Sequence, residues 1–148
     1  MLKVFKVIFD EILFMADFVA SHFPGRTGFV LRQAFFKIRV KKSGKNLRIG
    51  VGVEITGGEN ICVGNNVNIM KNTSFYVHDK GKVRLGDNIG INSNACIGAA
   101  NGGEIIIKNN VLIGNNVVIR AADHAFESVE NPIIEQGHNG GKIVIGDD

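Results

Sequence analysis

Residues 59–124 decide the fold, because they read as three consecutive copies of one 22-residue unit. The copies are ENICVGNNVNIMKNTSFYVHDK (59–80), GKVRLGDNIGINSNACIGAANG (81–102) and GEIIIKNNVLIGNNVVIRAADH (103–124). A fourth copy, GKIVIGDD, begins at Gly141 and runs to Asp148. Internal periods of about 20–50 residues are typical of stacked supersecondary units. The sequence therefore predicts a solenoid.

Each copy contains a shorter step of six residues between apolar positions. These positions are Val63, Ile69 and Phe75; Leu85, Ile91 and Ile97; and Ile107, Ile113 and Ile119. Second inward positions are Val67, Ile89 and Val111, together with Thr73, Ala95 and Val117. Six residues make one flat face, so the pattern predicts an all-β solenoid with a triangular core. Each larger buried side chain should stabilise that core by roughly 1.5–3 kcal/mol.

The residues at the predicted corners are those that tolerate unusual backbone conformations. Glycine follows the leading aliphatic residue at Gly50, Gly64, Gly86, Gly98, Gly114 and Gly146. A corner there needs either a positive φ angle or a close approach of two backbones. Pairs of Asn and Asp come next, at 65–66, 87–88, 109–110 and 115–116. These residues also accept left-handed conformations, so the path is predicted to alternate strand and corner.

Residues 1–44 lack the repeat and are predicted to form an N-terminal helical segment, whereas residues 45–148 form the solenoid. Residues 2–22 read as an amphipathic helix that ends at Pro24-Gly25. Its narrow polar stripe consists of Lys3, Lys6, Asp10 and Asp17. A second, shorter helix is predicted from Thr27 to Val40. The charges in the first helix argue against a membrane-spanning segment and against a secretory signal.

Positive charge is concentrated between Asp17 and Glu54, where no acidic residue occurs. The basic residues there are Arg26, Arg32, Lys37, Arg39, Lys41, Lys42, Lys45 and Arg48. One interpretation is that residues 1–48 contact an anionic membrane surface or a lipid-diphosphate-linked glycan. We prefer the other, a solvated helix whose apolar face packs across the open end of the solenoid or on a neighbouring subunit. Nucleic acid is not expected as a partner, because no recognition motif accompanies the charge.

The composition is that of one domain with a sizeable core, since 45% of the 148 residues are hydrophobic. Cys62 and Cys96 occupy different columns of the repeat. Reduced thiols and a cytoplasmic location are therefore expected. The membrane interpretation would place the protein at the inner face of the membrane.

The coils resemble the hexapeptide-repeat acyltransferases, and among them the sugar and polysaccharide O-acetyltransferases that include galactoside and maltose acetyltransferases. The resemblance covers about residues 45–148 and includes the segments I-N-S-N-A-C-I (91–97) and G-K-I-V-I-G (141–146). It implies a left-handed parallel β-helix, a handedness that departs from the usual crossover rule. It also implies transfer of an acetyl group from acetyl-CoA to a hydroxyl of a sugar or surface-polysaccharide precursor. Homotrimers with active sites between subunits are expected on the same ground.

His124 is the predicted catalytic residue. The repeat is interrupted directly after it, and residues 125–140 intervene before Gly141. Loops that leave a solenoid at a corner often carry the functional site. The resemblance places a catalytic histidine here, before a protruding loop that ends in Pro-Ile, as at Pro132-Ile133. Histidine, with an ordinary pKa of about 6.5, can accept the proton of an attacking alcohol and return it to the leaving thiolate.

Asn92 and Asp123 are the predicted acceptor-binding residues. The segment around Asn92 matches one in the galactoside acetyltransferases where an Asn contacts the acceptor, and an amide can donate to and accept from a sugar hydroxyl. An ordinary corner Asn explains the residue equally well. Asp123 directly precedes His124 and could orient its ring, although adjacent side chains usually point apart and a corner Asp is more often a turn residue.

Two alternatives to a transferase remain open. Some left-handed β-helices, the γ-class carbonic anhydrases, bind zinc through three histidines, and His78, His124 and His138 would be the candidates. A third ligand at metal spacing is missing unless His138 turns inward, so no metal is expected. His22 is predicted to be a capping or surface residue. The second alternative is a non-catalytic trimeric scaffold.

The sequence stops within a hexapeptide, at Ile145-Gly146-Asp147-Asp148. The resemblance implies further coils that carry the main coenzyme A contacts. The C-terminal coils are therefore expected to be truncated, and the cofactor-binding residues are expected beyond Asp148.

Overall fold

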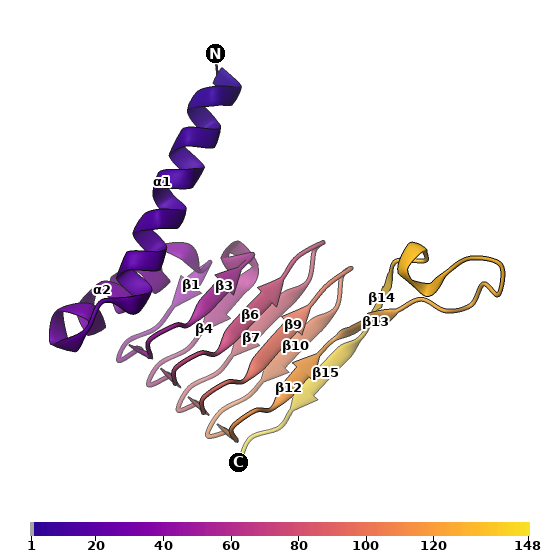
Figure 1. The fold of residues 1–148 in the computed structure, drawn as a ribbon. Coiled ribbons are helices and arrows are strands. Elements are labelled where there is room, and N and C mark those ends of the chain that lie inside the picture. Colours follow the sequence, from indigo (N-terminus) through magenta and orange to yellow (C-terminus); the bar gives the residue numbers. More distant parts are fainter. Residues whose placement is uncertain (1) are drawn as a thin grey trace.

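The computed structural model describes residues 2–148, with the side chains of 2–6, 9 and 10 outside the described part. Parallel sheets wind around one core, and two helices stand at the N-terminal end (Figure 1). This architecture matches a left-handed β-helix with an N-terminal helical segment. The fold class predicted from the repeat is confirmed.

Each face of the solenoid is one parallel sheet. The first contains β1 (Lys42–Ser43), β4 (Ile61–Val63), β7 (Lys82–Leu85), β10 (Glu104–Ile107) and β15 (Lys142–Ile145) in this order. The second contains β11 (Leu112–Ile113), β8 (Gly90–Ile91), β5 (Asn68–Ile69) and β2 (Arg48–Ile49). The third contains β12 (Val118–Arg120), β9 (Cys96–Ala99), β6 (Ser74–Val77) and β3 (Glu54–Thr56). The register follows the repeat, so that Ile107 pairs with Leu85 and Ile113 with Ile91.

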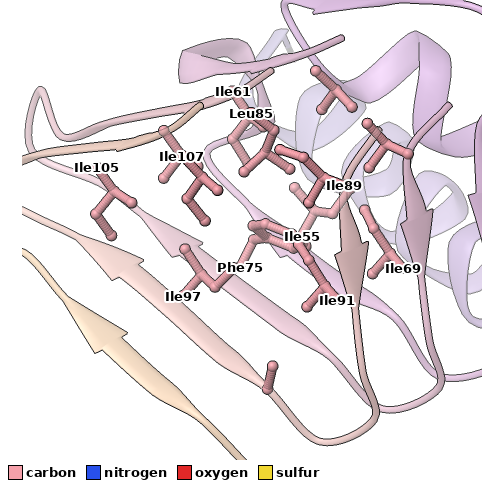
Figure 2. Close-up of a cluster of buried hydrophobic side chains, with 14 of the residues drawn as sticks. Ile55, Ile61, Ile69, Phe75, Leu85, Ile89, Ile91, Ile97, Ile105 and Ile107 are labelled. Atoms are coloured by element: carbon pink, nitrogen blue, oxygen red, sulfur yellow. The ribbon is translucent and has the colours of Figure 1, made fainter. Parts of the chain in front are cut away.

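The predicted inward columns form the core. Ile69, Phe75, Ile91 and Ile97 are completely buried, and Figure 2 shows their side chains gathered between the sheets. Thr73 is also completely buried, and its hydroxyl donates a hydrogen bond to a backbone carbonyl over 3.2 Å. A six-residue step therefore identified the interior correctly, including the buried hydroxyl of Thr73.

The glycines and the asparagines at the predicted corners have different structural roles. A Cβ at Gly64 would lie 2.4 Å from the carbonyl oxygen of Gly86, so glycine there permits a close approach of coils. Positive φ angles fall instead on asparagines, for example Asn66 (55°), Asn88 (60°) and Asn110 (62°). These three side chains also form a ladder, with amide hydrogen bonds of 2.9 Å from each coil to the next.

The helices α1 (Leu2–His22) and α2 (Gly25–Arg39) occupy the predicted ranges, with α2 beginning two residues earlier than Thr27. α2 covers the N-terminal end of the solenoid. Its Phe36 is buried and meets Phe75 edge-on, with ring centroids 6.4 Å apart. Its buried Arg32 donates to the carbonyl oxygens of Ile49 and Phe23 over 3.0 and 2.7 Å. The preferred packing interpretation therefore describes α2.

α1 behaves differently from α2, because it contacts α2 and then extends away from the solenoid (Figure 1). Within the predicted polar stripe, Asp17 forms an ion pair with Arg39. Lys3, Lys6 and Asp10 lie outside the described side chains. In the part of the chain that the structure describes, no helix is both long and apolar enough to cross a membrane.

Candidate active site

The interruption of the repeat forms a hairpin that protrudes from one corner. β13 (Ala122–His124) leaves the third coil, and β14 (His138–Gly140) returns to β15. The two strands pair antiparallel, and their register places His124 opposite His138. Figure 1 shows the hairpin and its connecting loop extending beyond the body of the solenoid. The same corner is closed by a short turn in the preceding coils, where the N–H of Gly103 donates to the carbonyl of Ala100 over 2.8 Å.

The base of the hairpin is fixed to the two preceding copies of the repeat, residues 81–102 and 103–124. The backbone N–H of Gly141 donates to the carbonyl of Ala121 over 2.8 Å, which returns the chain to the solenoid. The side-chain amide of Asn101 donates to the carbonyl of His138. Gly140 packs so closely that a Cβ there would lie 2.3 Å from the carbonyl oxygen of Asn101. The position of His138 is therefore set by contacts of β14 with Asn101, in the copy of the repeat at residues 81–102.

The two imidazoles lie against each other and line a groove. Their ring centroids are 4.3 Å apart and their planes are inclined by 35°. His124 is exposed, whereas His138 is half-buried. The groove has a volume of about 660 Å³ and is lined by residues 120–124 and 138–143. A neutral imidazole carries one N–H donor and one acceptor nitrogen, so the pair can accept a proton at one ring and donate a hydrogen bond from the other.

The cationic residues Lys142 and Arg120 also line the groove. Lys142 forms an ion pair of 3.2 Å with Glu104, which also meets Arg84 over 3.1 Å. The hydrogen bond from Lys142 is the main cause that lowers the pKa of Glu104 below its ordinary value. Arg120 also lines the groove, and it makes no ion pair with any residue that the structure describes. Its guanidinium is thus available to an anionic group.

The loop beyond the hairpin combines an internal polar network with an apolar exterior. The Gln136 amide donates to the carbonyl of Ser128 over 2.9 Å, and the Asn139 amide donates to Glu127 over 3.0 Å. Hydrogen bonding to its own backbone N–H first, and then to Asn139, lowers the pKa of Glu127. Large apolar side chains nevertheless point into solvent, at Phe126, Val129, Ile133 and Ile134.

The predicted site residues do not all meet in one protomer. His124 lines the groove, and so does Asp123. However, the Asp123 carboxylate accepts its hydrogen bond from the backbone N–H of His124 over 2.8 Å, and not from the ring. Asn92 lies between β8 and β9, at another corner, and does not line this groove.

The remaining histidines occupy other places. His78 lies on an earlier coil, with its Nδ1 2.8 Å from the carboxylate of Asp79. His22 lies at the end of α1 and contacts the carbonyl of Phe18 over 3.0 Å. Among the residues that the structure describes, no group of three or more His, Cys, Asp or Glu side chains could hold a metal ion.

His138 is the groove residue that sequence reasoning did not place beside His124. The signal available was indirect. His124 is the last residue before the interruption, and His138 lies three residues before the repeat resumes at Gly141. An insertion that leaves and rejoins a solenoid at one corner must bring its two ends together.

The chain matches no protein-family model and no curated protein. Among solved structures it is similar to a mutant of AntD, an N-acyltransferase from Bacillus cereus, in complex with dTDP and coenzyme A. The identity is 22% and the TM-score 0.62, over 77% of this chain and 61% of AntD. The chain thus spans less than two thirds of the length of AntD, and the likeness concerns the fold.

Proposed function

We propose that the protein is an acyltransferase that moves an acetyl group from acetyl-CoA to a hydroxyl of a sugar or surface-polysaccharide precursor. The observation that carries the proposal is the imidazole of His124, exposed in a polar groove where the repeat opens into a hairpin. The fold supports it, because AntD, which shares this fold, is an N-acyltransferase with coenzyme A in its complex. Acetyl-CoA as donor fits the cytoplasmic location proposed for the chain.

His124 acts as the general base in this proposal. The attacking hydroxyl has too high a pKa to ionise near neutral pH, so a base must accept its proton as the new bond to the acetyl carbonyl forms. The proton then passes to the sulfur of the leaving thiolate. His138 is a positioning residue, because its ring lies against that of His124 and its backbone is held by Asn101. Contact between the rings restricts the orientations available to the base.

The groove favours a polar acceptor. Arg120 offers a guanidinium suited to a phosphate of a donor or a nucleotide-linked or lipid-linked sugar. Asp123 offers a carboxylate beside the base, which can accept a hydrogen bond from a neighbouring sugar hydroxyl.

A homotrimer is the proposed assembly. The exposed apolar side chains of the hairpin loop, such as Phe126 and Ile134, are suited to contact with an adjacent copy. Because Asn92 lies at another corner, its proposed contact with the acceptor would come from that adjacent copy.

The test is thiol release from acetyl-CoA, measured with a thiol-trapping reagent against a panel of sugars and amino sugars. His124→Ala should fold normally and lower kcat by about 10² to 10⁴, the usual contribution of a general base. His22→Ala is the matched control, because His22 lies on α1 and far along the chain from the groove. Unchanged turnover in His124→Ala would remove this residue from the mechanism. Preference for amino sugars would replace O-transfer by N-transfer, and absence of thiol release would favour the scaffold.

A further inference from the structure

α1 exposes a large apolar surface that neither the solenoid nor α2 covers. Val7, Ile12, Phe14, Met15, Phe18 and Val19 are between 56% and 71% exposed. On the described part of α1 only Ala20 is buried. Figure 1 shows the helix projecting past the first coil, with its N-terminus far from the sheets. Contiguous apolar surface of this kind on a water-soluble domain marks a contact site.

The surface continues onto α2. Ile38 is 76% exposed, and it lines an apolar groove of about 410 Å³ together with Leu13, Phe14 and Phe35. Aromatic residues are concentrated in this region, since eight of the ten phenylalanines of the chain lie within residues 1–36. By helical spacing, Val7, Phe14 and Phe18 share one face of α1. The two helices thus present a largely apolar surface, which we call the α1–α2 surface and which includes the exposed Glu11.

Positive charge lies on α2 and on the segment that follows it, residues 41–48. Of the eight basic residues between Asp17 and Glu54, two are used inside the protein. Arg32 donates to backbone carbonyls, and Arg39 is paired with Asp17. The other six are Arg26, Lys37, Lys41, Lys42, Lys45 and Arg48. All six are exposed and have no ion pair among the described residues.

We propose that the α1–α2 surface docks onto an anionic lipid membrane, with α1 lying in the interfacial layer. Phe14 and Phe18 enter the boundary with the acyl chains, and Lys37 and Lys41 meet the lipid headgroups. Amphipathic helices with aromatic and basic residues bind membranes in this way, through buried apolar area and attraction to anionic lipids together. The inference is independent of the proposed function, because α1 and the hairpin lie at opposite ends of the solenoid (Figure 1).

Charge favours a membrane over a second copy of the same surface. Two α1–α2 surfaces in contact would bring together the unpaired cations of α2, Arg26 and Lys37, from both copies. The acidic residues of the two helices are Asp10, Glu11 and Asp17, and Asp17 is already paired with Arg39. An anionic bilayer supplies the missing negative charge and at the same time covers the apolar side chains.

The experiment is flotation of the full chain with vesicles of phosphatidylcholine alone and of phosphatidylcholine mixed with phosphatidylglycerol. The wild-type chain should bind the mixed vesicles and lose binding as salt is raised. Lys37→Ala combined with Lys41→Ala should lower the partition coefficient about thirtyfold, at ~1 kcal/mol for each basic residue near the surface. Phe14→Asp combined with Phe18→Asp should abolish binding.

The matched control is Phe126→Asp combined with Val129→Asp, because these apolar side chains are also exposed but lie on the hairpin loop. This control should bind vesicles like the wild type, and thiol release by the α1 and lysine variants should match the wild type with a water-soluble acceptor. Equal binding to both kinds of vesicle, or binding that survives both double substitutions, would overturn the proposal. So would light scattering in which the Phe14 and Phe18 variant falls from trimer to monomer, since a second copy would then be the occupant.

Discussion

Replacing Gly140 by alanine tests whether the position of the hairpin determines the activity proposed for His124. A Cβ at Gly140 would lie 2.3 Å from the carbonyl oxygen of Asn101 and 2.7 Å from the backbone nitrogen of Gly103. Both neighbours are backbone atoms, so neither can rotate aside as a side chain could. Since attractive contacts begin at roughly 3.5 Å, β14 must move away from the second coil by about 1 Å.

This movement reaches the imidazole pair directly, because His138 lies on β14 and its ring centroid is 4.3 Å from that of His124. A misplacement of about 1 Å can lower a catalytic rate about 10²-fold. That factor corresponds to ~2.7 kcal/mol of transition-state stabilisation. The same overlap should destabilise the fold by about 1–3 kcal/mol, the usual effect of an added methyl group in a packed site.

The measurement is kcat/KM for thiol release, with thermal unfolding of each variant to establish that it is folded at the assay temperature. Gly146→Ala is the matched control, because a Cβ there meets no atom within 4 Å and its φ angle is not positive. Its activity should equal that of the wild type. A folded Gly140→Ala variant with wild-type kcat/KM would refute the claim that β14 positions the site.

Two further predictions concern stability. Phe75→Ala should lower the free energy of unfolding by about 3–5 kcal/mol in urea titration, because Phe75 is completely buried and packs against Phe36. Leu112→Ala, at a 77% exposed position, should change it by less than about 0.5 kcal/mol. The lowered pKa of Glu104 predicts a contribution that is complete above the ordinary pKa of 4.5 and is lost as pH falls through the lower value in the folded state. The Tm of Glu104→Gln should therefore decrease less than that of the wild type as the pH is lowered from neutral to acidic values. The same decrease in both proteins would contradict the role given to Lys142.

The interior of the solenoid was predictable because its signal is local and repeated. Ile69, Ile91 and Ile113 recur every 22 residues, so each copy supports the same assignment. The corners were predicted in type but not in detail. Glycine allows both a positive φ and a close backbone approach, and only the packing of Gly64 on Gly86 shows that close approach is the reason.

The sequence predicted that the two helices exist, but it did not predict which of their faces pack against the solenoid. Periodicity indicated α1 and α2, but it carries no information about which face meets the solenoid. Arg32 illustrates the difficulty. In the sequence it is one of eight basic residues between Asp17 and Glu54, a stretch that contains no acidic residue. In the structure it is buried and donates hydrogen bonds to two backbone carbonyls. Counting basic residues in the sequence therefore overestimates the positive charge at the surface, because some of these residues bind buried backbone carbonyls instead.

The candidate site lies where the 22-residue repeat is interrupted, after His124. Asp79 and Asn101 are the equivalents of Asp123 in the earlier coils, and both adopt positive φ angles in a closed turn, whereas Asp123 lies in β13. Residue type alone does not explain the difference, because Asp occurs at this position in both a closed and an open corner. The inserted residues 125–140 pair β13 with β14 and hold the corner open. His124 thereby becomes a strand residue facing His138, and this long-range pairing, which no periodicity encodes, creates the groove.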